Sequence, residues 1–298
     1  MTDLINLCNK ISCKYIENAL LRDYTTFKVG GPCKVMVFPD NETNIAEIIR
    51  YLTTADINYY IIGKGSNLLF TDEGFDGVII NTCDFDLIEI NGTDISCSTG
   101  TSLTKLCRFA LDKSLTGLEF AFGIPGTVGG AVYMNAGAYG GEIKDVITEC
   151  RCIDKAGIIK SFTLDDMSLS YRHSVFADSD DLFILSATFH LAQGDYDSIK
   201  DRMNELIGKR KDKQPIEYPS AGSTFKRPEG YFAGALIEEC GLKGYCYGGA
   251  MVSEKHAGFV INHNNATFDD VMAVINHCQD VVSKEKNVTL ETEVKIID

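Results

Sequence analysis

A glycine-rich stretch at residues 117–141, GLEFAFGIPGTVGGAVYMNAGAYGG, constrains this chain more than any other segment. Its one charged side chain is Glu119, so the main chain must supply most of the polar groups. Glycines allow positive φ and close approach of another molecule, and successive backbone N–H groups can form an anion-binding concavity. The stretch therefore favours a loop around a phosphate or diphosphate, with tight turns of an irregular β domain as an equal alternative.

Length and composition indicate a soluble globular protein. The chain has 298 residues, of which 45% are hydrophobic and 23% charged, enough for two or three domains. No apolar run approaches the ~18 residues that span a bilayer. The N-terminus lacks the basic start and apolar block of a signal peptide. We therefore expect a cytoplasmic protein without membrane insertion.

Cysteine and histidine patterns argue against a metal site. The eleven cysteines show no CxxC or other paired ligand spacing, and the five histidines form no HxH or HExxH motif. The cysteines are typical of small buried hydrophobes in a reducing compartment. We expect no bound metal.

Charge argues against nucleic acid or anionic membrane as a partner, because the formal net charge is −14. Residues 199–256 differ, with ten Lys and Arg against eight Asp and Glu. This segment is a candidate for holding an anionic small ligand, with an ordinary solvated face as the alternative.

Hydrophobic spacing predicts mixed helices and strands in the first third of the chain. The pattern predicts a helix over 4–16, a strand over 35–38, a helix capped by Asn44 and a strand over 59–62. The last strand leads into GKGSN at 63–67, a place suited to phosphate contacts. This loop lacks the third glycine and following helix of a Rossmann fingerprint, and the chain has no Walker loop.

Later segments continue the same alternation. Asn91-Gly92 predicts a hairpin, and apolar spacing predicts helices over 102–112, 199–213, 233–240 and 269–284. Strict alternation predicts a final strand over 288–298. Pro215 and Pro219 indicate a domain boundary nearby.

Six motifs in order cover nearly the whole chain. They are GKGSN at 63–67, GIPGTVGGAVYMNAGAYG at 123–140, SYRHS at 170–174, AGSTFKRP at 221–228, SEKHAGFVIN at 253–262 and LETEV at 290–294. Together they resemble the UDP-N-acetylenolpyruvoylglucosamine reductases. The resemblance implies an α+β flavoprotein fold of the PCMH/vanillyl-alcohol-oxidase type, with two subdomains around FAD and a C-terminal α+β substrate-binding domain.

The resemblance also implies domain limits and a reaction. It implies FAD-binding subdomains at 1–82 and 83–198, a substrate-binding domain at 199–288, and a C-terminal strand at 289–298 that returns towards the active site. The implied enzyme, of peptidoglycan precursor synthesis, uses NADPH as co-substrate and non-covalent FAD to reduce UDP-N-acetylglucosamine enolpyruvate to UDP-N-acetylmuramate. Its partners are the UDP-sugar and NADPH, and we expect a monomer or weak dimer.

Three residues match catalytic positions of the family. The resemblance implies that Arg172 and Glu293 flank the developing enolate and that Ser223 protonates it. A guanidinium fork suits a dianionic enediolate, and a carbon-centred anion is basic enough to take a serine proton. Glu293 helps only if it is neutral, which burial favours. From the residues alone, Ser223 is typical of a turn or cap, Glu293 of a solvated strand face and Arg172 of a surface ion pair.

The resemblance assigns ligand contacts as well. Implied cofactor-binding residues are Gly63, Gly65, Ser66, Asn67, Leu68, Gly123, Ile124, Gly126, Thr127, Gly129, Gly130, Asn135, Ala136, Gly137 and Ala138. Because EGYFAG follows Pro228 directly, the chain is similar to the shorter form of the family, in which Tyr171 is expected near the substrate. The other implied substrate-binding residues are Lys226, Arg227, Lys243, Gly248, Gly249, Lys255 and His256; Arg227 stands where some members carry asparagine.

Two other interpretations stay open. One is an FAD-dependent sugar or lactone oxidase of the same fold, which the missing flavin-linking histidine and the AGSTFKRP motif disfavour. The other is a non-catalytic nucleotide-sugar-binding protein, which the joint presence of Arg172, Ser223 and Glu293 disfavours.

Overall fold

The chain is an α+β protein whose strands form several small sheets. The computed structural model describes all residues, 1–298, and packing divides them into two units. Unit 1 comprises Met1–Glu17, Lys34–Lys64 and Gly77–Gly208, and unit 2 comprises Asn18–Cys33, Gly65–Asp76 and Lys209–Asp298. The expected boundaries after residues 82, 198 and 288 stay a prediction. None of the helices has both the length and the apolar character that a membrane span requires.

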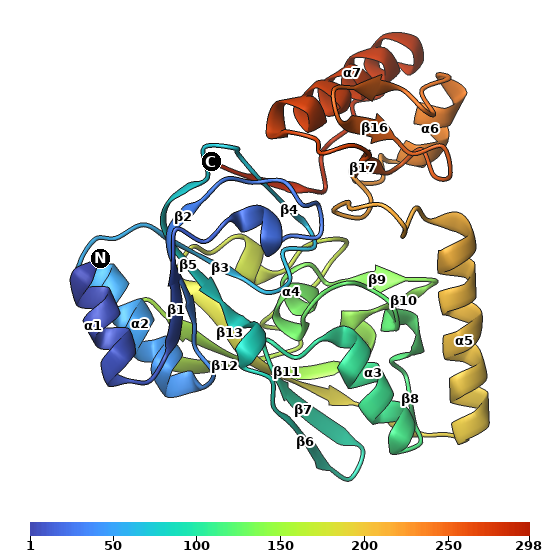
Figure 1. Ribbon diagram of the computed structural model, residues 1–298. Helices are drawn as coiled ribbons and strands as arrows, with labels where there is room; N and C mark the ends of the chain where they lie inside the picture. Colours follow the sequence, from blue (N-terminus) through green and yellow to red (C-terminus); the bar gives the residue numbers. More distant parts are fainter. The chain divides into compact units, whose positions relative to one another are not determined.

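Unit 1 contains a four-stranded sheet in the order β1-β2-β5-β3, with helices α1 and α2 beside it (Figure 1). In α2 the apolar residues recur at i, i+3, i+4 and i+7, so one face is buried against the sheet. Neighbours β1 and β2 are antiparallel, whereas β3 and β5 are parallel. The bounds are α1 Thr2–Lys10, β1 Lys14–Glu17, β2 Cys33–Phe38, α2 Glu42–Thr54, β3 Tyr59–Ile62 and β5 Phe75–Asn81.

Unit 1 also contains a five-stranded antiparallel sheet in the order β12-β11-β13-β7-β6. The largest hydrophobic core of the protein packs this sheet against helices α3 and α4. The bounds are β6 Ile88–Asn91, β7 Asp94–Ser98, α3 Leu103–Asp112, α4 Val128–Tyr133, β11 Ile147–Asp154, β12 Ile159–Thr163 and β13 Leu182–His190. Two-residue strands pair as β8 Leu115–Thr116 with β14 Ala192–Gln193, and β9 Gly137–Ala138 with β10 Gly141–Glu142.

Unit 2 is built on a three-stranded sheet, β15-β16-β17, packed against α6 and α7. Figure 1 shows α7 lying across this sheet. A separate parallel pair joins β4 to the C-terminal strand β18. The bounds are β4 Leu68–Phe70, α6 Ala233–Glu239, β15 Cys246–Tyr247, β16 Ala250–Val252, β17 Val260–Asn262, α7 Phe268–Lys286 and β18 Lys295–Ile297. Helix α5 spans Tyr196–Lys213, and its residues up to Gly208 are assigned to unit 1.

Most predicted elements are confirmed, including the 59–62 strand, the hairpin and the long helices. Short 3₁₀ turns, which the apolar pattern does not reveal, lie at Leu21–Asp23, Thr82–Asp84, Glu119–Ala121, Ile143–Asp145 and Val175–Ala177. The hairpin turn falls one residue later than expected, because Asn91 pairs with Asp94 and Gly92 has φ +62°.

Three boundary predictions are wrong. The first helix ends at Lys10, because Ser12 adopts a left-handed φ of +56°, and Tyr15 lies in β1. Asn44 lies inside α2; the cap is Asn41, whose side chain accepts a hydrogen bond from the Asn44 N–H at 2.9 Å. The final strand covers only Lys295–Ile297, since residues before it pair by isolated bonds with another segment.

Candidate functional site

The glycine-rich stretch of unit 1 runs beside residues 99–103 before it enters α4. Val128 N–H donates to Thr101 O at 2.8 Å, Gly129 N–H to Thr99 O at 2.9 Å, and Leu103 N–H to Gly126 O at 3.1 Å. A Cβ on Gly129 would collide with the Thr99 hydroxyl. Glycine is therefore required here for packing of the two segments.

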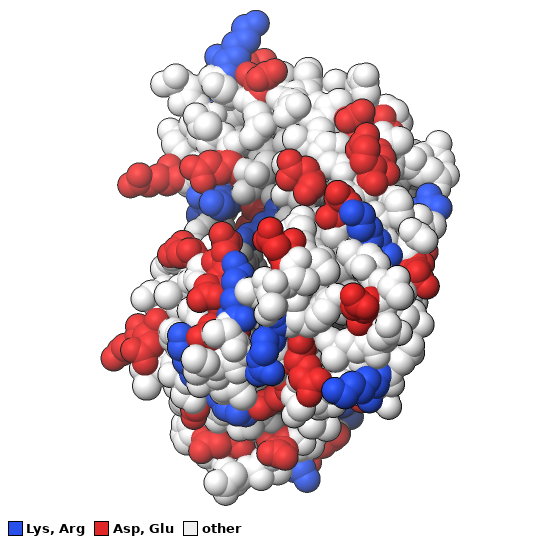
Figure 2. Space-filling view, turned by 90° about the vertical axis from the view of Figure 1, so that its left-hand side faces the viewer, with Lys and Arg blue, Asp and Glu red and all other residues white.

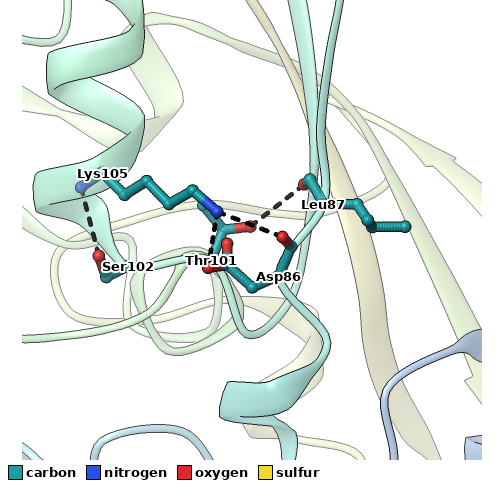
Figure 3. Close-up of polar contacts among 5 residues, drawn as sticks. All are labelled: Asp86, Leu87, Thr101, Ser102 and Lys105. Carbon is teal, nitrogen blue, oxygen red and sulfur yellow. Dashed lines mark hydrogen bonds and ion pairs between the residues drawn. The ribbon is translucent and has the colours of Figure 1, made fainter.

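Side-chain hydrogen bonds of Thr101 and Ser102 hold the 99–103 segment to neighbouring residues (Figure 3). Ser102 caps α3 by accepting from the Lys105 N–H at 3.2 Å, and Thr101 donates to Leu87 O at 3.2 Å. Lys105 Nζ lies 2.7 Å from Asp86 Oδ2. The partner of the glycine-rich stretch is thus held in place independently of any ligand.

Gly63 approaches the same stretch within unit 1. A Cβ on Gly63 would collide with the Thr127 side chain, and its distance to Thr127 Cγ2 would be 2.9 Å. Thr127 is 2% exposed and occupies the N-cap position of α4, yet its hydroxyl makes no cap hydrogen bond. Two of the predicted cofactor-binding segments, 63 and 126–130, therefore meet, and the Thr127 hydroxyl can bind another group.

The predicted catalytic Arg172 lies at the tip of a two-residue turn in unit 1. Ser170 and His173 close the turn by exchanging backbone hydrogen bonds of 3.1 and 3.2 Å. Arg172 has a left-handed φ of +54°, and its Nη2 donates to Gly137 O at 3.4 Å. Its guanidinium lies 5.3 Å from the ring centroid of Tyr171, which is 51% exposed. The turn thus contacts the glycine-rich stretch through Arg172.

Asn135 is part of this arrangement but is used internally. Its amide donates to Glu142 Oε2 at 2.7 Å and to Ser170 O at 2.9 Å, and its oxygen accepts from the Lys144 N–H at 3.0 Å. Both donors of the side-chain amide are therefore committed to protein groups.

In unit 2, the segment carrying Ser223 runs antiparallel to the segment carrying Glu293. Glu293 N–H donates to Thr224 O at 2.8 Å, and Lys226 N–H donates to Glu291 O at 2.9 Å. Phe225 and Thr292 form an antiparallel bridge. Two predicted catalytic residues that are far apart in sequence are thereby brought together, and both are half-buried.

The GKGSN loop meets the same C-terminal segment. Asn67 Nδ2 donates to Glu293 O at 3.0 Å, and Lys295 N–H donates to Asn67 O at 2.9 Å. Leu68 pairs with Lys295 in the β4–β18 ladder. At Gly65, φ is +58° and a Cβ would lie 2.6 Å from Tyr24 O, so this position requires glycine. Predicted cofactor and catalytic residues are adjacent in unit 2.

The donor sets fit a flavin dinucleotide. A diphosphate is best bound by neutral or positive groups. These segments offer the main chain around their glycines, the Thr127 hydroxyl and the exposed Lys64. No acidic side chain interrupts 63–68 or 123–138. Sequence reasoning did not single out Lys64, although it stands within the GKGSN motif.

The predicted diphosphate cations of unit 2 already have partners. Lys226 Nζ lies 3.2 Å from Glu291, Lys243 Nζ 2.6 Å from Glu238, and Lys255 Nζ 3.4 Å from Glu217. Arg227 stacks over the Phe232 ring at 4.0 Å from its centroid. These exposed pairs contribute little to stability, so an anionic ligand can exchange them at low cost. Figure 2 shows Lys and Arg interspersed with Asp and Glu over the face it presents.

The predicted Gly248, Gly249 and His256 serve the local packing of unit 2. A Cβ on Gly248 would collide with the Asp270 carboxylate, which accepts from the Gly249 N–H at 2.9 Å. His256 Nδ1 accepts from the Gly258 N–H at 3.1 Å. Burial is the main reason that the pKa of His256 lies below its ordinary value. His256 is therefore a neutral hydrogen-bonding group at neutral pH.

Comparisons with known proteins agree across the chain. Residues 33–163 match the family model described as an FAD binding domain, and residues 214–297 match that of the UDP-N-acetylenolpyruvoylglucosamine reductase C-terminal domain. UDP-N-acetylenolpyruvoylglucosamine reductase of Caldanaerobacter subterraneus subsp. tengcongensis is 45% identical over 95% of this chain and 94% of its own length. The Clostridium beijerinckii protein of that name is 47% identical over 94% of this chain and 91% of its own.

A solved structure agrees with these sequence matches. The crystal structure of UDP-N-acetylenolpyruvylglucosamine reductase from Thermus caldophilus superposes with a TM-score of 0.82 and 32% identity, covering 96% of this chain and 99% of the other. With such similarity over nearly its full length, this chain belongs to the UDP-N-acetylenolpyruvoylglucosamine reductase family.

Proposed function

We propose that this chain is the NADPH- and FAD-dependent enzyme that reduces UDP-N-acetylglucosamine enolpyruvate to UDP-N-acetylmuramate for peptidoglycan precursor synthesis. Its relatives carry the reductase name, and residues 33–163 match an FAD binding domain. The structural observation that carries the proposal is the pairing of the Ser223 and Glu293 segments through the 2.8 Å bond from Glu293 N–H to Thr224 O.

FAD, when bound, supplies hydride-transfer chemistry, which protein side chains lack. We propose that the cofactor-binding residues named from the resemblance, at 63–68 and 123–138, hold it without a covalent bond. Asn135 would contribute only its main chain, because both donors of its amide are committed to protein groups. Main-chain N–H groups and the Thr127 hydroxyl would bind its diphosphate. The left-handed φ of Gly65 and Gly123 supports this use of the backbone.

Arg172 is proposed to hold the charge that appears on the substrate. Addition of a hydride to the terminal alkene carbon leaves negative charge beside the substrate carboxylate. A planar guanidinium can bind the two oxygens of this enediolate together. Because that charge is absent from the ground state, the interaction accelerates the reaction rather than merely tightening binding.

Ser223 is proposed to deliver the proton that ends the reaction, with Glu293 next to it. A carbon-centred anion is basic enough to accept a serine proton when the hydroxyl is well placed, so geometry matters more than a shifted pKa. The antiparallel pairing at Thr224 and Glu293 provides such fixed geometry. Tyr171 and the basic residues Lys226, Arg227, Lys243 and Lys255, with Gly248, Gly249 and His256, are proposed to bind the UDP-sugar.

The two half-reactions test this proposal. In the absence of oxygen, NADPH should bleach the flavin absorbance and the enolpyruvyl substrate should restore it. In Ser223→Ala, the rate of bleaching by NADPH should stay within about twofold of the wild-type rate. The rate of recolouring by substrate should fall by about 10²-fold or more, in the range expected for loss of a general acid. Ser283→Ala, an exposed serine on α7, is the matched control. Equal loss in both half-reactions would remove Ser223 from the proton-transfer role.

The same preparation tests the alternatives. A sugar or lactone oxidase would consume oxygen with a sugar substrate and would not recolour with the enolpyruvyl compound. With a non-catalytic binding protein, neither NADPH nor the enolpyruvyl substrate would change the absorbance. We also propose a cytoplasmic monomer or weak dimer; the eleven cysteines without disulfides support a reducing compartment, and sedimentation would test the oligomeric state.

A further inference from the structure

The end of helix α4 carries an asparagine where glycine is the usual residue. Asn135 N–H donates to Val132 O at 3.1 Å, and Ala136 N–H donates to Ala131 O at 2.8 Å. These two bonds form a Schellman motif, whose left-handed residue is most often glycine. Asn135 occupies that position with φ +41°. Its side chain must therefore offer something that glycine lacks.

The Asn135 amide links three neighbouring backbone segments. Asn135 is 1% exposed, and its Nδ2 donates to Ser170 O, which also closes the Tyr171–Arg172 turn. The second Nδ2 donor goes to Glu142 of strand β10, whose partner strand β9 contains Gly137. Gly137 O in turn accepts from the Arg172 guanidinium. The amide thus joins the base of the arginine turn to the hairpin that the arginine contacts.

A second clamp holds the same turn against α4. Ser174 is fully buried, and its hydroxyl donates to Tyr133 O at 2.7 Å. That carbonyl belongs to the last residue of α4. Asn135 and Ser174 therefore anchor both sides of the turn through hydrogen bonds of buried side chains, which are costly to leave unpaired.

We propose that Asn135 and Ser174 are positioning residues that hold Arg172 in its working orientation, and that the Asn135 side chain does not contact the cofactor. This inference rests on the proposed function, in which Arg172 acts on the substrate. Displacement of a catalytic group by about 1 Å can cost about 10²-fold in rate, so the two clamps should matter for turnover although neither touches the substrate.

Asn135→Gly is the most selective test, because glycine favours the same left-handed backbone and only the amide is lost. We expect recolouring by substrate to slow at least tenfold more than bleaching by NADPH. In an Arg172→Ala background the same change should cost nothing further, because the two residues act through one interaction. Asn287→Gly, at the exposed left-handed residue that ends α7, is the matched control.

Ser174→Ala provides a second test and should show the same selective loss. Loss of bound flavin in Asn135→Gly, equal slowing of both half-reactions, or additive effects with Arg172→Ala would overturn the proposal. NMR of the Arg172 Nε–H separates a failure of this inference from a failure of the proposed function. Its signal should change in Asn135→Gly whether or not the wild type turns over substrate, and an unchanged signal would overturn the inference.

Discussion

At the residue scale, His256 shows how local packing decides what a predicted ligand residue can do. The basic segment at 199–256 suggested a cation for an anionic ligand. The structure instead makes Nδ1 of His256 an acceptor for the Gly258 N–H and packs the ring against Phe259, with centroids 5.0 Å apart. A role in binding the UDP-sugar would therefore use a neutral Nε2–H donor.

A pH dependence of stability follows from His256. The unfolded residue takes up a proton near its ordinary pKa of about 6.5, whereas the folded residue does so only at lower pH. The free energy of unfolding should thus fall as the pH drops below about 6.5, until the folded pKa is passed. His256→Asn, whose Oδ1 can accept the same bond, should lack this component. Urea unfolding of both proteins at several pH values would check it; identical pH profiles would contradict it.

At the element scale, sequence periodicity predicted helices well and their ends poorly. Apolar spacing placed α3 and α7 to within two residues, because their buried faces repeat every turn. The start of α2 was misplaced because Asn41 and Asn44 are both good caps, and only the backbone selects the first. The final strand was predicted too long, because residues 290–294 alternate between polar and apolar types as a strand does. In the structure these residues make only isolated backbone bonds to residues 224–226.

Helix α7 provides a test of one such end. Thr267 Oγ1 accepts from the Asp270 N–H, and Asp270 Oδ2 accepts from the Thr267 N–H, each at 3.1 Å. Loss of this capping box in Thr267→Ala should cost about 1 kcal/mol, or about fivefold faster hydrogen exchange in the first turn of α7. Thr267→Ser keeps the hydroxyl and should exchange at close to the wild-type rate. Unchanged exchange in Thr267→Ala would argue against the cap.

At the scale of the whole molecule, the family motifs and the apolar periodicity carry different information. The motifs of one family include Ser223, Glu293 and Asn67, and hydrogen bonds hold the segments of these residues together in unit 2. The composition of that unit was not predictable, because residues 18–33 and 65–76 join the last third of the chain through contacts distant in sequence. The anchoring role of Asn135 was also hidden, since its motif does not show which partners its amide binds.

The C-terminal strand tests this long-range construction. Strand β18 is the only ladder partner of β4, and Thr71 N–H donates to Ile297 O at 3.3 Å. Deletion of residues 295–298 should therefore expose the β4 amides to exchange, because they lose their pairing, while the five-stranded sheet of unit 1 keeps its protection. Since Lys295 also binds Asn67, which holds Glu293 O, recolouring by substrate should slow as well. Equal deprotection of both units would mean that β18 supports global folding rather than this local pairing.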